Sequence, residues 1–477
     1  MGKPIVIFRA DGSFKTGLGH LVRSSALAEM ISADFDCRLL YSECPPSLLP
    51  DLEHSFSSVE RLPESATIAE ELSILLKQLG TICVTVVLDG YQFDTTYQND
   101  LAAAGHKVVC IDDIHRYAFT ADLVINHAPS AVLADYTFAS HTAFAFGTRF
   151  ALLRKPFREL ARAYNSIKSD AGIFVCLGGA DPGNATLQVL KRLEELDVSA
   201  PVSVVIGSAY RYARELDAFT ARSPLHLSVF HNLGPKEMAQ RMAMSGIGIT
   251  SPSTVCLEYL STGGQLYLKV IADNQEEIYR SLIEKGQALD FNQFGTSIHS
   301  GEEGRGIPVI DGWQPYRYRA LFRNLGISYR AAQPSDSDLY FEWANDAQVR
   351  AQSFSSKQIS LAEHQQWFNR KLSDAANKLL LFYIGSDPIG QVRLTLEGTT
   401  AIIGYSVAST ARGRGTGSAM LLHAENFLQR HHPEIRALRG YVKQTNPASI
   451  VTFRRLGYKE SSPTEYVNAL KFELHEL

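Results

Sequence analysis

The chain has 477 residues, of which 45% are hydrophobic and 20% are charged, and its formal net charge is −4. A chain of this length exceeds a single hydrophobic core, so we expect about three domains. The small net charge excludes the basic surface typical of proteins that bind nucleic acids or anionic membranes. No apolar run approaches the roughly 20 residues of a membrane-spanning helix. The start, Met1-Gly2-Lys3-Pro4, leads directly into a strand and has no signal-peptide core.

The six cysteines point to the compartment. None forms a C-x-x-C pair, and most lie in apolar, strand-like runs. Such cysteines are typically buried and reduced, as in proteins of a reducing compartment. We therefore expect a cytoplasmic protein with free thiols, and the chain offers no cluster at metal-ligand spacing, so no metal is expected. The cysteines are Cys37, Cys44, Cys83, Cys110, Cys176 and Cys256.

The amino-terminal region, residues 1–155, alternates short aliphatic runs with helical patterns, which is typical of a doubly wound parallel sheet. A buried strand beginning at Ile5 leads into the loop Thr16-Gly17-Leu18-Gly19-His20 and then into a helix. Free N–H groups at a helix start attract anions, and His20 adds a titratable imidazole beside them. Two further predicted strands, residues 84–89 and 107–113, end in acids. Doubly wound sheets place their ligands at such strand ends.

A second region of the same kind covers residues 165–320 and predicts a second Rossmann-like domain. Three of its predicted strands are followed by polar turns: Gly178 to Asn184, Thr250 to Glu258, and Ala272 to Gln275. Hydroxyls and free N–H groups at a helix start suit a diphosphate, and a glutamate in the first turns suits ribose hydroxyls. The amides of the third turn suit neutral polar groups. Two such domains in succession predict a nucleotide-binding cleft.

Six motifs of these two regions occur in the order of a known family. Residues 3–320 resemble the UDP-sugar hydrolase of pseudaminic acid biosynthesis, which removes UDP from UDP-2,4-diacetamido-2,4,6-trideoxy-β-L-altrose. The motifs are Arg9-Ala10-Asp11-Gly12, Gly17-Leu18-Gly19-His20, Asp122-Leu123-Val124-Ile125-Asn126, Phe146-Gly147 through Leu153-Arg154, Gly178-Gly179-Ala180-Asp181-Pro182 and Asp273-Asn274-Gln275.

The resemblance implies a glycosyltransferase-B-type arrangement of two Rossmann-like domains, with the nucleotide held by the second. It implies that His20 deprotonates the attacking water and that Asn274 positions water or sugar. One departure is the turn Ser251-Pro252-Ser253-Thr254, where a more glycine-rich sequence is expected. The residues expected to bind UDP or the sugar are Asp11, Gly17, Gly19, Gly179, Asn184, Ser253, Thr254, Glu258 and Gln275.

From Ile327 onward the pattern changes. The segment between Trp313 and Leu325 predicts a closing helix or a linker. Three closely spaced strands at 379–384, 388–396 and 401–407 then predict an antiparallel meander. They precede Arg412-Gly413-Arg414-Gly415-Thr416-Gly417, whose R-x-x-G-x-G spacing predicts a nest of N–H groups for a pyrophosphate. Residues 327–477 therefore predict a separate α+β domain.

This third domain resembles the GNAT acetyltransferases, and the resemblance implies acetyl-CoA as a co-substrate. Many GNAT enzymes carry a tyrosine as general acid seven residues after the asparagine that matches Asn446, but here Phe453 occupies that position. A phenyl ring donates no proton, so the role is absent or taken by Tyr405, Tyr441 or Tyr458. The residues expected to bind acetyl-CoA are Val407, Arg412, Gly413, Arg414, Gly415, Thr416, Gly417 and Asn446.

Together the two resemblances predict a bifunctional sugar-nucleotide enzyme. The carboxyl-terminal domain would acetylate the amine of a UDP-4-amino-sugar, and the amino-terminal domains would then hydrolyse the product to free sugar and UDP. Two alternatives stay open: a glycosyltransferase with an appended GNAT domain, and a hydrolase whose GNAT domain only binds acetyl-CoA. The expected partners are small-molecule UDP-sugars and other enzymes of the same pathway, with neither nucleic acid nor membrane.

Overall fold

The computed structural model describes residues 2–13, 18–64, 67–163, 172–295, 308–462 and 466–475. Among these residues, no helix is long and apolar enough to cross a membrane. Contacts between Cα atoms divide the chain into two compact units. One unit combines Met1–Ile125, Leu133–Ala145 and Pro315–Leu477, and the other combines Asn126–Val132 and Phe146–Gln314.

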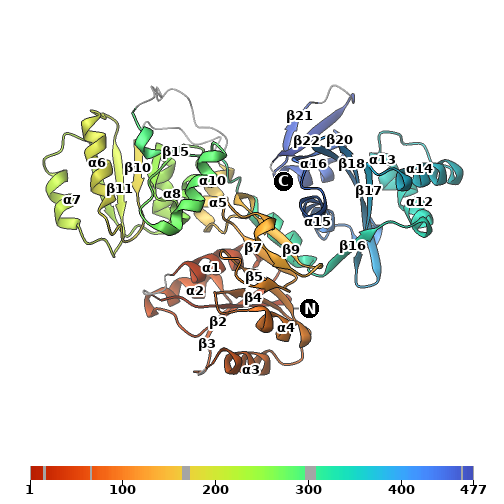
Figure 1. Ribbon diagram of the computed structural model, residues 1–477, viewed down its shortest axis with the longest axis horizontal. Helices are drawn as coiled ribbons and strands as arrows, with labels where there is room; N and C mark the ends of the chain where they lie inside the picture. The colour runs from red at the N-terminus through yellow and green to blue at the C-terminus, as the bar shows by residue number, and fades with distance from the viewer. Residues whose placement is uncertain are drawn as a thin grey trace. The chain divides into compact units, whose positions relative to one another are not determined.

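The first sheet is doubly wound, with strand order β3-β2-β1-β4-β5-β7-β9 and parallel pairing from β3 through β7. In Figure 1 its strands and helices run from red to orange. A two-stranded ribbon of β6 (Ala118–Phe119) and β8 (Thr137–Phe138) accompanies the sheet. The strands are β1 (Ile5–Ala10), β2 (Asp36–Tyr41), β3 (Ser58–Arg61), β4 (Thr85–Asp89), β5 (Lys107–Ile111), β7 (Leu123–Asn126) and β9 (Ala143–Phe146), and the helices are α1 (Gly19–Ile31), α2 (Leu49–Ser55), α3 (Ile68–Leu79) and α4 (Thr95–Ala103).

The second sheet repeats this topology in the order β12-β11-β10-β13-β14-β15, again with parallel pairs. Figure 1 shows α6 and α7 on one face and α5, α8 and α10 on the other. The strands are β10 (Gly172–Cys176), β11 (Val202–Ile206), β12 (Leu227–His231), β13 (Ser245–Thr250), β14 (Gln265–Leu268) and β15 (Leu289–Asp290), and the helices are α5 (Lys155–Arg162), α6 (Ala185–Glu195), α7 (Ala213–Thr220), α8 (Pro235–Ala243), α9 (Thr254–Tyr259) and α10 (Glu276–Glu284).

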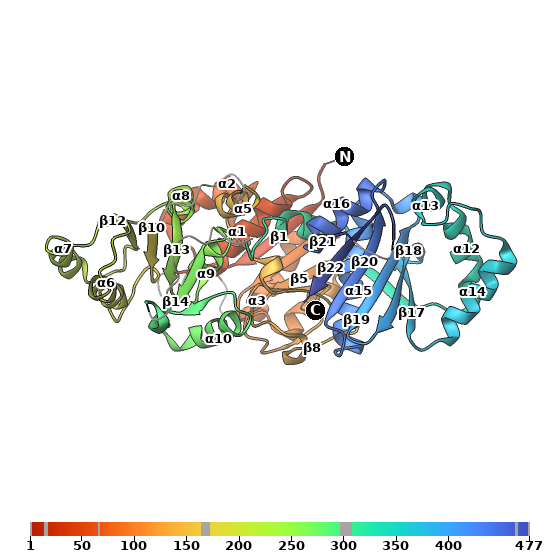
Figure 2. The same cartoon turned by 90° about the horizontal axis from the view of Figure 1, so that it is seen from above.

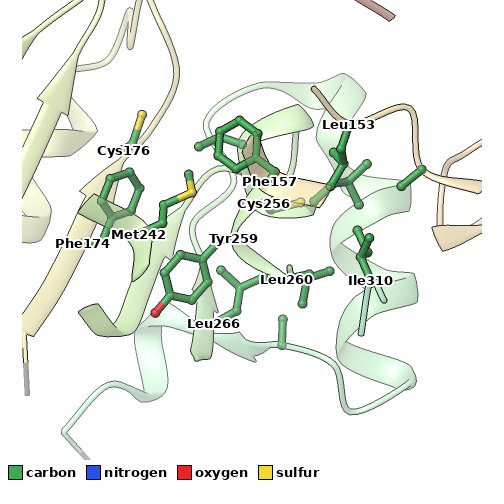
Figure 3. Packing of buried hydrophobic residues seen from close by; sticks show 14 of the residues in the cluster. Leu153, Phe157, Phe174, Cys176, Met242, Cys256, Tyr259, Leu260, Leu266 and Ile310 are labelled. Atoms are coloured by element: carbon green, nitrogen blue, oxygen red, sulfur yellow. The ribbon is translucent and has the colours of Figure 1, made fainter. Parts of the chain in front are cut away.

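One core of this second sheet packs around Tyr259 (Figure 3). Its ring stacks on Phe174 at 6.1 Å between centroids, and its hydroxyl donates to the backbone carbonyl of Ser245 at 3.0 Å. A Cβ added to Gly248 would lie 2.6 Å from the same ring, and one added to Gly264 would lie 2.4 Å from its hydroxyl. Two glycines therefore make the space that lets this large side chain reach full burial.

The third sheet is mainly antiparallel, in the order β16-β17-β18-β19-β20-β22-β21. Helix α15 lies on one face and α12 to α14 on the other (Figures 1 and 2). The strands are β16 (Ile327–Ala331), β17 (Asn377–Ile384), β18 (Asp387–Glu397), β19 (Thr400–Val407), β20 (Ala437–Lys443), β21 (Lys459–Ser461) and β22 (Ala469–His475), and the helices are α11 (Gln314–Arg323), α12 (Ser337–Asn345), α13 (Ala347–Gln352), α14 (Leu361–Ser373), α15 (Thr416–His431) and α16 (Pro447–Arg455).

Among the described strands of this sheet, β19 and β20 form the one parallel pair, and their pairing ends part-way along. β19 pairs with β20 from Thr400 to Ile403 only, although both strands continue beyond that point. From Gly404 onward β19 and β20 no longer pair with each other, so backbone groups become accessible between them. The predicted meander is confirmed, and of the two alternatives left open for the segment before it, helix or linker, the structure has the helix α11.

Two parallel α/β domains followed by an α+β domain were expected from the sequence, and this fold class is confirmed. The cysteines are free, as predicted. Four of the six are buried, whereas Cys44 is half-buried and Cys83 is exposed. The expectation of burial thus holds for most of them but not for Cys83, which lies between α3 and β4.

Candidate functional site

The first candidate site lies where the order of the first sheet reverses. β1 and β4 are neighbours, yet the chain leaves β1 toward β2 on one side and later returns to β4 on the other. His20, in the first turn of α1, and Asp89, the last residue of β4, meet at this switch point. His20 Nδ1 lies 2.6 Å from Asp89 Oδ1. Ligands of doubly wound sheets bind at such points.

Asp89 is fully buried and is held from three sides. Arg23 Nε donates to both carboxylate oxygens at 3.0 and 2.9 Å, and Ser24 Oγ donates to Oδ2 at 3.1 Å. Burial by itself raises the pKa of a carboxyl, but the charge of Arg23 and the bonds from His20 and Arg23 hold the pKa of Asp89 below its ordinary value. The ionised carboxylate fixes the imidazole with Nδ1 as donor, which leaves Nε2 as the basic nitrogen.

Tyr91 completes the surroundings of His20, and Asp113 holds Arg23 from the far side. Tyr91 packs edge-on against the imidazole with 4.9 Å between ring centroids. Burial and the neighbouring Asp113 raise the pKa of Tyr91 to about 12, so its hydroxyl stays protonated at neutral pH. Arg23 Nη1 donates to Asp113 at 2.7 Å, which ties the arginine to β5's end as well as to Asp89.

Asp11, predicted to bind substrate, is engaged with the protein backbone. Its Oδ1 accepts the N–H groups of Ser42 and Glu43 at 2.7 and 3.0 Å and pairs with Arg9 Nη1 at 2.7 Å. Asp11 therefore joins the ends of β1 and β2. Its other oxygen, Oδ2, accepts a hydrogen bond from Gln92 Nε2 at 3.4 Å. Gly19 is the first residue of α1, and a Cβ there would meet nothing within 4 Å. Gly17 lies outside the described residues.

In the second unit, the turn after β10 comes very close to the end of β11. A Cβ added to Gly207 would lie 2.5 Å from Gly179 Cα, and Gly178 has φ of +96°. Asp181 then accepts the N–H groups of Ala185 and Thr186, both at 2.8 Å, and so caps α6. Because Asp181 already satisfies these donors, the start of α6 is less available to an anion than the sequence suggested.

Asn184, another predicted nucleotide ligand, has a side chain with two protein partners. Its Oδ1 accepts the Tyr210 hydroxyl at 2.6 Å, and its Nδ2 donates to Glu215 at 3.0 Å. Asn184 sits in the left-handed region, with φ of +51°.

The turn after β13 is different: Ser251 and Ser253 share a hydrogen bond at 3.1 Å, and Ser253 is the N-cap residue of α9 although its side chain makes no capping hydrogen bond. Their hydroxyls precede Thr254, the first residue of that helix.

Glu258 is 3% exposed and pairs with one cation. Both bonds from Arg154, Nη2 at 2.6 Å and Nε at 3.1 Å, end on Oε1. Burial raises the pKa of Glu258, and Arg154 offsets only part of that effect. Oε2 is the oxygen that Arg154 leaves to another donor.

The turn after β14 contains Asn274 and Gln275 in a short 3-10 helix, Asp273–Gln275. Gln275 Oε1 accepts the N–H of Ile271 at 3.0 Å, which closes the turn and leaves its amide nitrogen as a donor. Asn274 is exposed. β10, β13 and β14 are adjacent parallel strands, so the three predicted polar turns do share one edge of the second sheet.

In the carboxyl-terminal domain, two glycines shape the loop between β19 and α15, the loop predicted to bind a pyrophosphate and called the cradle below (residues 412–417). Gly413 and Gly415 both have φ of +80°, a conformation that favours glycine. Within the described part of the chain, the backbone N–H groups of residues 413 to 415 donate no hydrogen bond. Successive free N–H groups in such a turn at a helix start form an anion-binding nest.

The remaining residues predicted for this loop shape it. Arg412 donates to Val407 O at 3.0 Å, to Gln348 at 2.8 Å and to Asp346 at 2.8 Å, so its side chain is committed within the domain. Thr416 is buried and its hydroxyl donates to Ala411 O at 2.8 Å. Arg414 is exposed, Gly417 allows β19 to pack on the first turn of α15, and Asn446 caps α16 through Ser449 N–H at 3.2 Å.

Comparison with known families decides the nature of this domain. Residues 327–459 match the family model of the acetyltransferase (GNAT) domain. The carboxyl-terminal domain is a GNAT acetyltransferase domain. A solved structure similar to it is spermidine N-acetyltransferase from Vibrio cholerae in complex with CoA and spermine, with 15% identity, coverage of 32% of this chain and 96% of that chain, and a TM-score of 0.29.

Two curated proteins match beyond the GNAT domain. The chain is 24% identical over 292 residues to UDP-2,4-diacetamido-2,4,6-trideoxy-beta-L-altropyranose hydrolase of Campylobacter jejuni, which covers 60% of this chain and 98% of that protein. It is 21% identical over 485 residues to an uncharacterized protein of Methanocaldococcus jannaschii, covering 94% and 96%. Both resemblances read from the sequence are therefore confirmed: hydrolase-like residues are followed by a GNAT domain.

Phe453 of the GNAT domain lies in its core. The ring is 2% exposed, stacks on Phe472 at 5.3 Å and fills the space left by Gly440. Of the tyrosines considered as its replacement, Tyr458 donates to buried Glu425 at 3.1 Å and is committed to the core. The ring of Tyr441 packs against the ring of Tyr466, with 4.9 Å between the centroids.

Tyr405 is the tyrosine beside the opening of the sheet. It lies two residues beyond the last pair of β19 with β20, and its hydroxyl is 3.1 Å from Ser449 Oγ. Burial raises the pKa of Tyr405, so it remains a proton donor at neutral pH. A Cβ on Gly417 would lie 3.0 Å from its ring, which places Tyr405 against the first turn of α15.

The sequence reading missed Asp89 and Arg23 as site residues. Asp89 was visible as the acid that ends a buried strand, and Arg23 follows His20 by three positions, which puts both on one helix face. The missing information was that β4 is the neighbour of β1. Among the described residues, no group of three or more metal-ligating side chains is placed to hold a metal ion.

Proposed function

We propose that the chain is a bifunctional enzyme of sugar-nucleotide metabolism. Its GNAT domain would transfer an acetyl group from acetyl-CoA to the amine of a UDP-4-amino-sugar. Its α/β domains would hydrolyse the resulting UDP-2,4-diacetamido-2,4,6-trideoxyhexose to free sugar and UDP. The observation that carries the hydrolytic half is the 2.6 Å contact between His20 Nδ1 and buried Asp89, in a region similar to the Campylobacter jejuni hydrolase.

In the hydrolytic step, Asp89 fixes the tautomer and His20 supplies the base. With Nδ1–H donated to Asp89, Nε2 accepts a proton from water as the water oxygen bonds to the anomeric carbon. The bond between that carbon and the diphosphate oxygen breaks, and UDP leaves with the electron pair. The imidazolium formed is stabilised by the Asp89 carboxylate, which Arg23 and Ser24 keep in place.

We assign nucleotide binding to the second α/β domain. Oε2 of Glu258 and the hydroxyls of Ser253 and Thr254 are suited to ribose and diphosphate, because they lie at the edge formed by β10, β13 and β14. Asn274 is exposed at the same edge and is our candidate for orienting sugar or water. The α6 start contributes less, since Asp181 already caps it.

In the acetyl-transfer step, the N–H groups of residues 413 to 415 would bind the pyrophosphate of acetyl-CoA. The residues fit this group: the two glycines hold the donors free, and Thr416 fixes the start of α15. Bound acetyl-CoA supplies the activated acetyl group. The nitrogen of an uncharged substrate amine bonds to the acetyl carbon as the carbon–sulfur bond breaks. Tyr405 is our candidate for giving a proton to the departing thiolate, and it regains one from the nitrogen, which loses a proton as the amide forms.

The experiment supplies each substrate separately and follows each product. A UDP-4-amino-sugar with acetyl-CoA should give free CoA thiol and a product heavier by one acetyl group in mass spectrometry. The diacetamido sugar nucleotide alone should release UDP. His20→Ala should abolish UDP release and leave CoA release intact, whereas Gly415→Ala should do the reverse.

The same assay separates the alternatives. A glycosyltransferase would release UDP only with an acceptor present, so UDP release in buffer alone contradicts that function. An acetyl-CoA-binding module without activity would bind acetyl-CoA and release no thiol with any UDP-amino-sugar. Phe453 in the core makes this last outcome a real competitor, because the position of the usual general acid holds a phenyl ring.

A further inference from the structure

Helix α11 precedes the residues that match the GNAT family and presents one of its faces to the GNAT cradle. Tyr316, Ala320 and Asn324 follow one another at intervals of four residues, so they lie on one side of the helix and its end. All three contact the loop before α15 or its first turn. The family match begins at residue 327, so these three residues lie outside the matched domain, whereas their partners in the loop and in α15 lie inside it.

The contacts run from Arg414, between the two glycines of the cradle, to Ser418 in the first turn of α15. Tyr316 Oη lies 2.8 Å from Oγ of buried Ser418. A Cβ on Gly415 would lie 3.4 Å from Ala320 Cα, so the backbone of α11 packs directly on this glycine. Asn324 Nδ2 lies 3.4 Å from the carbonyl of Arg414.

Asn324 is the buried polar residue among these three. It is 4% exposed, and its Nδ2 donates to Ala320 O at 2.7 Å, which fixes the amide. Its Oδ1 lies 3.3 Å from the Thr416 hydroxyl. One buried amide thus touches both the last carbonyl before Gly415 and the residue after it.

The neighbouring face of α11 is anchored to the first α/β domain, within the same compact unit. Arg319 donates to both oxygens of Asp34 at 2.6 and 2.9 Å, and Arg323 adds a bond at 2.5 Å. Phe322 packs edge-on against Phe35 at 6.0 Å. Asp34 follows α1, the helix that carries His20.

We propose that α11 braces the acetyl-CoA cradle, and that Asn324 is a positioning residue for acetyl-CoA. The proposal rests on the assignment of acetyl-CoA to this loop made above. A loop with two glycines at positive φ has many alternative conformations, and ordering it on binding would cost affinity. Asn324 and Ala320 hold the loop from behind, so its N–H groups face the ligand before it arrives.

The test measures acetyl-CoA affinity by isothermal titration calorimetry on the full chain. Asn324→Ala should raise the dissociation constant about tenfold, the equivalent of roughly one lost buried hydrogen bond. In the acetylation assay its KM for acetyl-CoA should rise while kcat stays near the wild-type value. Tyr316→Phe removes one hydroxyl and keeps the packing, so it should raise the dissociation constant for acetyl-CoA less, about threefold. This milder variant keeps the test available if Asn324→Ala does not fold.

Asn426→Ala is the matched control. Asn426 is also a buried asparagine, 7% exposed, and it binds the backbone N–H and carbonyl of Phe144 at 2.8 and 3.2 Å from the opposite end of α15. Its loss should lower thermal stability without changing acetyl-CoA affinity. The brace is contradicted if Asn324→Ala and Tyr316→Phe both bind acetyl-CoA with wild-type affinity. It is also contradicted if Asn426→Ala loses as much acetyl-CoA affinity as Asn324→Ala. A wild-type chain that binds no acetyl-CoA contradicts the assigned acetyltransferase function, and the brace with it.

Discussion

The two α/β sheets share a strand order but differ in what they place at the switch point. At the β1/β4 edge of the first sheet stand an imidazole, a buried carboxylate and an arginine: His20, Asp89 and Arg23. At the β10/β13 edge of the second stand two glycines and a pair of hydroxyls. The first edge can move a proton, whereas the second offers neutral donors and close backbone approach. In the function proposed above, one fold would thus supply chemistry in one copy and binding in the other.

Their buried carboxylates sharpen this difference. Asp89 has a pKa below its ordinary value because Arg23 and His20 outweigh the effect of burial. Glu258 has a raised pKa because Arg154 alone does not outweigh it. A carboxylate that stays ionised suits the orientation of a catalytic histidine, and one with a free oxygen suits the capture of a hydroxyl group.

The largest expected effect comes from removing the charge at the first switch point. Asp89→Asn should lower kcat of UDP release by about 10²- to 10⁴-fold, because it removes the carboxylate that fixes and stabilises the His20 imidazole. Steady-state UDP release measures the change. The KM should change little, since neither residue is assigned to the nucleotide.

Asp113→Asn is the matched control for this prediction. Asp113 is the other carboxylate on Arg23, at 2.7 Å, and is one-third exposed. Its loss should reduce kcat less than about fivefold, in line with the small value of partly exposed ion pairs. Equal losses in Asp89→Asn and Asp113→Asn would mean that Arg23, rather than the contact with His20, carries the effect.

The second prediction addresses the binding edge. Glu258→Gln should raise KM for the UDP-sugar about tenfold, because a hydrogen bond to a charged acceptor is lost, and should leave kcat within about twofold. The measurement is the same assay over a range of substrate concentrations. A fall in kcat at unchanged KM would place Glu258 with the reacting groups and break the comparison drawn above.

The sequence predicted those site residues that belong to local motifs, and it missed the contacts that depend on strand order. His20 and the three polar turns of the second domain were visible because each is a local motif: a turn with glycine, hydroxyl or amide residues that follows a predicted strand. The contact of His20 with Asp89 joins positions 69 residues apart. It depends on β4 lying next to β1, and strand order is a property of the folded sheet that no local pattern carries.

The GNAT domain gives a similar lesson. Its loop could be read from the spacing of its glycines, and the position of Phe453 raised the question of a general acid. The packing of Phe453 on Gly440 and Phe472 could not be read, because it depends on long-range contacts. The support of Gly415 by Ala320 lies across 95 positions of sequence and was equally hidden.

The third prediction tests close packing at the binding edge. Gly207→Ala would place a Cβ 2.5 Å from Gly179 Cα and 2.6 Å from its carbonyl oxygen, so the turn after β10 must shift. We expect KM for the UDP-sugar to rise a few-fold and the second unit to lose about 1–3 kcal/mol of stability, the usual cost of overpacking. Gly183→Ala, whose Cβ would meet nothing within 4 Å, is the control and should change neither quantity.

The smallest expected effect concerns stability and pH. Because the folded chain raises the pKa of Glu258 above its ordinary value of 4.5, folded Glu258 binds its proton more tightly than the unfolded chain does. Ionised Glu258 therefore weakens the fold at neutral pH, and this cost disappears as the pH falls toward 4.5. The free energy of unfolding of Glu258→Gln should be higher than that of the wild type by on the order of 1 kcal/mol at pH 7, and the difference should shrink at pH 5. Urea unfolding of both proteins at the two pH values measures it. A variant that loses stability most at pH 7 would show that the Arg154 pair outweighs burial, and the contrast with Asp89 would then vanish.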